Sequence, residues 1–187
     1  MEDDVKIFGF WLYLMTDLVI FAVLFATFIV LRNNTFGGPS GHDLFQLGPA
    51  FAETLILLTS SFTCSLATLS IQRKQKNGVI FWFAVTFLLG VSFLTIELSE
   101  FSQFIHEGAG PQRSGFLSSF FTLVGTHGLH IFIGLLWMLV AMVQVWTRKL
   151  SAPDVSRFYR LAFFWHFLDI VWIFIFTVVY GMGHLQS

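Results

Sequence analysis

One apolar stretch in the second half of the chain limits what this sequence can fold into. Residues 116–138 read FLSSFFTLVGTHGLHIFIGLLWM and are apolar over the length that crosses a bilayer as a helix. Ser119, His127, Gly134 and Ala141 follow one face of such a helix, and His130 lies one turn after His127. A stripe of small and polar residues is the face that a membrane helix presents to other helices rather than to lipid. The stretch therefore predicts a spanning helix packed within a bundle.

The two histidines in this stretch have two interpretations. Ionisable side chains at that depth are costly and usually functional, and histidine is the commonest metal ligand, so His127 and His130 could belong to a metal or haem site. Alternatively, they hydrogen-bond to neighbouring helices at a packing seam. The sequence has no Gly-rich phosphate loop and no Cys-x-x-Cys, although His127 and His166 could in principle act as a pair of haem ligands. We expect no catalytic, cofactor-binding or metal-binding residue in this chain.

The composition extends the membrane interpretation to the whole chain. Of 187 residues, 56% are hydrophobic and 11% are charged, which is about half the charged fraction of a soluble domain. The apolar runs predict an all-α, polytopic helix bundle in one membrane domain, residues 1–187, with spans at about 7–31, 49–71, 79–106, 116–146 and 158–182. Lys76, Asn77 and Gly78 predict a tight turn between the second and third spans. Cys64 lies in an apolar run, and we expect it to be a small packing residue.

The basic residues predict the orientation of the bundle. Five spans place the N-terminus and the loops after the second and fourth spans on one side. That side carries eight basic residues, and the other side only Arg32 and Arg113. The eight are Lys6, Arg73, Lys74, Lys76, Arg148, Lys149, Arg157 and Arg160. Because Lys and Arg accumulate in cytoplasmic loops, we expect the N-terminus inside and the C-terminus outside.

The intramembrane polar residues fall into two predicted layers when depth is counted at about 1.5 Å per helical residue. The outer layer contains Glu53, Glu97 and Glu100. The middle layer contains Asp17, His127, His130, His166 and Asp169. Such layers could form a proton relay. The interpretation that we favour is that they are buried polar pairs that fix the register of the helices, since nothing in the sequence supplies an inner exit for protons.

Particular contacts are expected within these layers. We predict that Glu97 or Glu100 reaches His127 across the seam between the third and fourth spans. Asp169 needs a partner, which could be His166 on its own helix, or Asp17 or His130 at similar depth on other helices. The flanking Trp165 and Trp172 are expected to be packing residues and lipid anchors.

Five sequence blocks together resemble subunit III of the haem-copper respiratory oxidases. They are FGFWLYLMTD (8–17), AETLILLTSS (52–61), the segment from Leu89-Gly90 through Glu97 to Glu100-Phe101, THGLH (126–130) and FWHFLDIVW (164–172). The blocks cover all five spans in the family's order. The mitochondrial-type subunit has seven spans, and this chain matches the last five. The short form, with KIFGFW (6–11) and GPQRSGFL (110–117), is most similar to the subunits of bacterial cytochrome o ubiquinol oxidases, although five-span subunits also occur in some cytochrome c oxidases.

The resemblance implies a non-catalytic subunit of a proton-pumping oxidase in the bacterial inner membrane. Haem and copper would belong to subunit I, which this chain would contact directly, with subunits II and IV in the same complex. The resemblance also implies that the chain stabilises subunit I, supports its proton uptake and holds phospholipid. A second possibility is an independent proton or ion carrier that uses the Glu and His layers, and a third is a haem protein in its own right. The net charge of −1 and the absence of a polybasic arm argue against a nucleic-acid partner.

Overall fold

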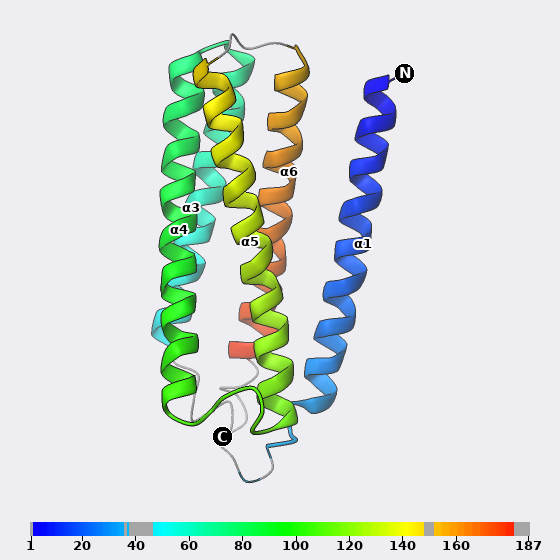
Figure 1. Ribbon diagram of the computed structural model, residues 1–187, viewed down its shortest axis with the longest axis vertical. Coiled ribbons are helices and arrows are strands. Elements are labelled where there is room, and N and C mark those ends of the chain that lie inside the picture. Colours follow the sequence, from blue (N-terminus) through cyan, green and yellow to red (C-terminus); the bar gives the residue numbers. More distant parts are fainter. Residues whose placement is uncertain (1, 36, 38–46, 148–151, 182–187) are drawn as a thin grey trace.

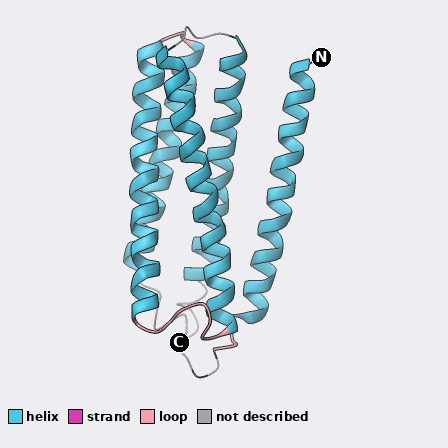
Figure 2. Ribbon diagram, viewed as in Figure 1, coloured by secondary structure: helices cyan, strands magenta, loops and turns pink. Residues whose placement is uncertain are grey.

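The computed structural model describes residues 2–35, 37, 47–147 and 152–181 and contains only helices and their connections in these ranges (Figures 1 and 2). The helices are α1 (Glu2–Leu31), α3 (Leu47–Gln72), α4 (Lys76–His106), α5 (Gly115–Thr147) and α6 (Ala152–Ile175), and a π-helix, η1 (Phe176–Gly181), continues α6. Five helices are long and apolar enough to cross a membrane. The all-α bundle with five spans is therefore confirmed.

The helix boundaries differ from the predicted spans mainly at the ends, because polar end residues still extend a helix. α4 begins at Lys76, so the predicted turn at Lys76–Gly78 is wrong, and the turn lies at residues 73–75, where Lys74 adopts a left-handed φ of 54°. α4 ends before Gly108, whose φ of 75° allows Ala109 N–H to donate to Phe104 O. Residue 182, the predicted end of the fifth span, lies outside the described residues, as do Arg148 and Lys149.

Helices α3, α4, α5 and α6 form a compact group in which α3 packs on α4 and α6, and α5 packs on α4 and α6. Helix α1 packs on α5 and, less extensively, on α6. Figure 1 shows that α1 stands apart from the other helices at the end that carries the N-terminus and approaches α5 at its opposite end. There the Phe116 N–H donates to Asn34 O over 3.3 Å.

Trp165 of α6 occupies the centre of the four-helix group. Its side chain is 1% exposed, and its indole N–H donates to Ser60 Oγ of α3 over 3.0 Å. A Cβ added to Gly90 of α4 would lie 2.7 Å from this ring, and one added to Gly134 of α5 would lie 3.2 Å from it. Glycine on two helices thus leaves the room that the large ring fills, which is how small residues let membrane helices approach closely.

The predicted small-residue stripe of α5 is confirmed, because Ser119, His127, Gly134 and Ala141 are all buried. His130 lies at the edge of this buried face and is partly exposed. Cys64 is a free, fully buried thiol, as expected for a packing residue.

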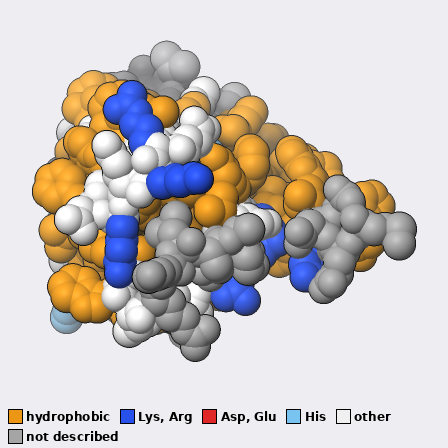
Figure 3. All heavy atoms as spheres, turned by 90° about the horizontal axis from the view of Figure 1, so that it is seen from above, with side chains coloured by type: hydrophobic (Ala, Val, Ile, Leu, Met, Phe, Trp, Pro, Cys, Tyr) orange, Lys and Arg blue, Asp and Glu red, His pale blue; other side chains and the backbone are white. Residues whose placement is uncertain are grey.

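Basic side chains gather at the end of the bundle where α3 ends, α4 and α6 begin and α1 begins. Figure 3 looks onto this end and shows Lys and Arg side chains over it. Those described here are Lys6, Arg73, Lys74, Lys76, Arg157 and Arg160. The opposite end carries Arg32 and Arg113 among the described residues.

Candidate functional site

The outer polar layer forms a real cluster between α3, α4 and η1. Glu53 is 0% and Glu97 2% exposed, and the carboxyl groups of Glu53, Glu97 and Glu100 are close enough to interact electrostatically. Tyr180 of η1, which the sequence reasoning missed, donates its hydroxyl to Glu100 Oε2 over 3.5 Å. The four carboxyl oxygens of Glu53 and Glu97 have no hydrogen-bond partner among the described residues. The predicted outer layer is therefore present, and Tyr180 adds a hydrogen-bond donor to it.

His127 makes no direct hydrogen bond to Glu97 or Glu100, so the predicted approach of one of these glutamates to the imidazole does not take that form. Both ring nitrogens of His127 lack a hydrogen-bond partner within the described ranges. The ring instead stacks on Trp172 at a centroid distance of 5.3 Å and meets the edge of Phe93 at 5.9 Å. Helix rotation accounts for this arrangement, since depth alone placed the residues together and the aromatic packing sets His127 against Trp172 of α6 and Phe93 of α4.

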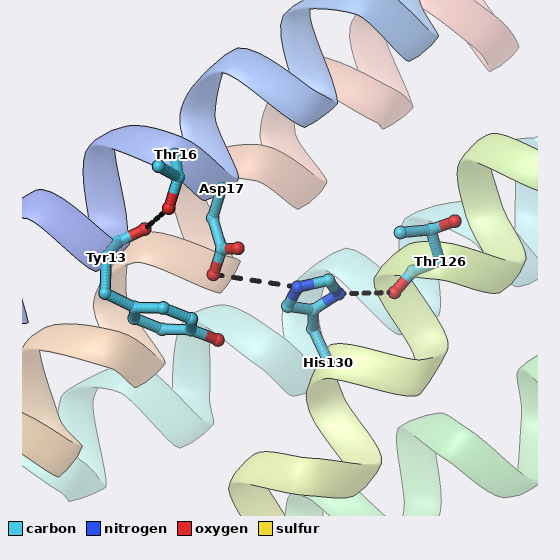
Figure 4. Close-up of polar contacts among 5 residues, drawn as sticks. All are labelled: Tyr13, Thr16, Asp17, Thr126 and His130. Carbon is cyan, nitrogen blue, oxygen red and sulfur yellow. Dashed lines mark hydrogen bonds and ion pairs between the residues drawn. The ribbon is translucent and has the colours of Figure 1, made fainter.

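Asp17 of α1 and His130 of α5 form an acid–imidazole pair between their two helices (Figure 4). Asp17 Oδ2 lies 3.6 Å from His130 Nε2. His130 Nδ1 lies 2.7 Å from the carbonyl oxygen of Thr126, and because a carbonyl only accepts, Nδ1 carries a proton. Tyr13, one turn before Asp17, also interacts electrostatically with this carboxyl group. The side chains of Asp17 and His130 are only 6% and 13% exposed, so the pair lies largely within the seam.

His166 and Asp169 lie at the seam between α3 and α6 and do not share the Asp17–His130 pair. His166 Nδ1 hydrogen-bonds to Ser61 Oγ, and His166 Nε2 lies 3.4 Å from Ser65 Oγ. Asp169 is 5% exposed, and neither of its oxygens has a hydrogen-bond partner in the part of the chain described. None of the three partners considered for Asp169, which were His166, Asp17 and His130, hydrogen-bonds to it, because Asp17 and His130 pair with each other and His166 bonds to serines of α3.

Hydroxyl and indole groups form further contacts that the sequence reasoning did not anticipate. Trp172 Nε1 donates to Thr54 Oγ1 over 3.2 Å, and Thr63 and Thr86 share a hydrogen bond of 2.8 Å between α3 and α4. Trp165 and Trp172 are almost fully buried, so their predicted packing role is right and their predicted role as lipid anchors is wrong. Glycines at the depth of Trp165 on two other helices were the signal that could have identified its central position.

These side chains form separate groups rather than one reactive centre. No set of three or more His, Cys, Asp or Glu side chains in the described ranges is grouped closely enough to hold a metal ion. Between these polar groups, the ring of His127 packs on the rings of Phe93 and Trp172. Most of these polar side chains are buried where two helices meet, and this arrangement suits contacts between helices.

Comparison with known proteins identifies the relatives of this bundle. The model of the family described as cytochrome c oxidase subunit III matches residues 3–184. The chain belongs to the cytochrome c oxidase subunit III family. It is 60% identical over 179 residues to cytochrome bo(3) ubiquinol oxidase subunit 3 of Pseudomonas aeruginosa, covering 96% of this chain and 86% of that protein.

Two further members of the family are also similar to this chain. Cytochrome bo(3) ubiquinol oxidase subunit 3 of Pseudomonas putida is 54% identical, with 98% of this chain and 89% of that protein covered. Cytochrome c oxidase subunit 3 of Bacillus sp. strain PS3 is 45% identical, with 98% and 88% covered. The resemblance to the subunit III family is thus confirmed. Together with its five apolar helices, membership of this family makes the chain a multi-pass membrane protein of a respiratory oxidase.

Proposed function

We propose that this chain is the non-catalytic subunit III of a proton-pumping bo3-type ubiquinol oxidase in a bacterial inner membrane. The observation that carries the proposal is the 60% identity to the Pseudomonas aeruginosa protein over 96% of this chain. In such a complex, quinol oxidation and oxygen reduction would take place on the haems and copper of subunit I. This chain would stabilise that subunit and support its proton uptake, beside subunits II and IV.

The arrangement of the polar groups supports a structural role. The Asp17–His130 pair joins α1 to α5, and the hydrogen bond from Trp165 to Ser60 joins α6 to α3. Buried polar pairs of this kind specify which helices meet and in which register. The basic end shown in Figure 3 supports an orientation with the N-terminus in the cytoplasm, because cytoplasmic loops collect Lys and Arg.

A groove between α1 and α6 is a candidate site for the phospholipid. It has a volume of about 400 Å³ and lies at the basic end of the bundle. Apolar side chains from both helices form most of its wall, and Arg160 and Tyr159 add polar groups suited to a headgroup. The lining residues are Ile7, Phe10, Trp11, Val155, Ser156, Tyr159, Arg160 and Phe163.

A second candidate function is subunit III of a five-span cytochrome c oxidase. It is favoured by the 45% identity to the cytochrome c oxidase subunit 3 of Bacillus sp. strain PS3. An independent proton or ion carrier is a third candidate, which rests on the buried Glu53–Glu97–Glu100 cluster.

Purification through an affinity tag on this chain separates these candidates. We expect a much larger haem-bearing subunit to co-purify and the complex to oxidise ubiquinol but not reduced cytochrome c. Oxidation of cytochrome c alone would move the assignment to the second candidate. Proton transport by the isolated chain in liposomes, without a haem subunit, would instead support the carrier.

A further inference from the structure

His166 is a partly exposed imidazole at the α3–α6 seam, deep within the span. It lies 11 residues after Val155 and 15 before Gly181, the ends of the fifth span, which places it roughly 16 and 22 Å along the helix from those ends. Ser65, its neighbour on α3, is exposed. Ionisable side chains at such a depth almost always face protein or a water-filled cavity rather than lipid.

The hydrogen bonds around His166 determine which group it offers outward. Ser65 Oγ donates its proton to the carbonyl oxygen of Ser61 over 3.1 Å, so Ser65 can only accept from the imidazole. His166 Nε2 therefore carries the proton that points to Ser65, and Nδ1 accepts from the Ser61 hydroxyl. At 3.4 Å this hydrogen bond to Ser65 is longer than an ordinary N–H···O bond, so an acceptor on a neighbouring helix could replace it with a shorter bond.

The surroundings of this donor resemble a helix-docking surface. Exposed apolar side chains lie one turn to either side of Ser65, at Phe62 and Leu69 of α3, and one turn after His166, at Ile170 of α6. We call these three residues with Ser65 and His166 the α3–α6 patch. A polar centre with an apolar border suits a second membrane helix, which packs on the border and satisfies the donor.

Exposed hydroxyl groups on α4 differ from His166, because they hydrogen-bond to carbonyl oxygens of their own helix. Ser92 and Thr95 on α4 are exposed, but their hydroxyls donate to Leu88 O and Val91 O of their own helix over 2.9 and 2.8 Å. Such groups are satisfied whether lipid or protein covers them. A partner helix would therefore gain no hydrogen bond on the outward face of α4, whereas at the α3–α6 patch it would replace the long hydrogen bond from His166 Nε2 to Ser65 with a shorter one.

We propose that the α3–α6 patch docks a transmembrane helix of another subunit of the same oxidase, which presents a hydrogen-bond acceptor to His166 Nε2–H. The proposal rests on the proposed function, since it requires a multisubunit complex. Lipid does not supply this acceptor, because acyl chains have none and the headgroups lie near the ends of the helices. A hydroxyl, a carboxyl group or a free backbone carbonyl on the partner helix has the required chemistry.

Photocrosslinking in native membranes tests the patch directly. A benzoylphenylalanine replaces Phe62, which is 63% exposed in the patch, and as a matched control replaces Phe81, which is 60% exposed on α4. After irradiation and purification of the complex, we expect Phe62→benzoylphenylalanine to join this chain to another oxidase subunit in higher yield than the control. Adducts with lipid only, or with a second copy of this chain, would overturn the proposal.

The failure of this inference is distinguishable from failure of the proposed function. If the tagged chain does not co-purify with a haem-bearing subunit, both fail. If it does co-purify and the Phe62 probe reaches only lipid, the complex stands and the α3–α6 patch is not the interface.

A substitution series then tests the hydrogen bond itself. His166→Phe keeps a ring without a donor and should lower the ratio of this chain to haem, after a detergent wash, by about threefold, the effect of one interhelical hydrogen bond in a membrane. His166→Asn, which keeps an N–H donor, should restore part of the ratio. Thr95→Val is the control and should leave the ratio unchanged. Equal retention of the His166→Phe and native chains would contradict the role of the donor.

Discussion

The four-helix group and α1 are held by different kinds of contact. Within the group, small residues bring backbones close to a buried ring, as Gly90 and Gly134 do around Trp165. Helix α1 instead meets its neighbours through large rings, such as Phe10 on Trp137 and Phe25 on Phe174, and through the Asp17–His130 pair. Close packing resists any change of volume, whereas ring contacts and one polar pair tolerate adjustment. The group is thus the rigid part of the subunit, and α1 is the part whose position depends on few interactions.

The largest expected effect comes from adding volume at the centre of the group. Gly90→Leu would drive a side chain into Trp165 and Leu135, which lie 2.7 and 2.9 Å from an added Cβ. We expect a loss of about 3 kcal/mol or more in stability, because overpacked cores force neighbouring side chains and backbone to shift. The measurement is the midpoint temperature of the purified complex together with the amount of this chain in it.

Gly9→Leu on α1 is the matched control. An added Cβ at Gly9 meets nothing within 4 Å, so the change should stay within about 0.5 kcal/mol. Equal losses for Gly9→Leu and Gly90→Leu would show that the two regions do not differ in packing.

The second prediction concerns the attachment of α1. Asp17→Asn should weaken the contact of α1 with α5 by about 1–2 kcal/mol, the upper range for polar contacts between membrane helices. His130→Ala should have a similar effect, and the double variant should lose less than the sum, because the two side chains interact with each other.

Spin labels measure this effect without relying on activity. Labels on Phe8 of α1 and Val143 of α5 occupy exposed positions near the basic end, where Figure 1 shows α1 apart from the bundle. We expect the distribution of label distances to broaden in Asp17→Asn. Strictly additive losses in the double variant, or an unchanged distribution of label distances, would show that the Asp17–His130 pair does not hold α1 in place.

The sequence could predict properties of single helices, but not how neighbouring helices rotate against each other. Hydropathy and small-residue spacing depend on one helix at a time, and they located the five spans, the buried stripe of α5 and the depth of the glutamates. The rotation of a helix depends on its neighbours, so His127 was placed against glutamate although it packs on Trp172. Tyr180 was missed because a π-helix changes the register of its side chain. Asp17 and His130 could be placed at one depth, but only packing decided that they meet.

The smallest expected effect lies within the four-helix group, at the hydrogen bond between Thr63 and Thr86. Their hydroxyl oxygens are 2.8 Å apart across the α3–α4 seam, and each also lies 2.9 Å from a carbonyl oxygen of its own helix. Because the backbone carbonyls offer alternative acceptors, losing one hydroxyl should cost only about 0.6 kcal/mol.

Thr63→Val and Thr86→Val preserve the shape of the side chain and remove the hydroxyl, so they measure the hydrogen bond with little change in packing. We expect each variant to lower the midpoint temperature of the complex slightly, and the double variant to lower it by little more than either single change, because both remove the same bond. A loss in Thr63→Val as large as that in Asp17→Asn would mean that polar contacts also hold the four-helix group together, and that small-residue packing around Trp165 is not its main support.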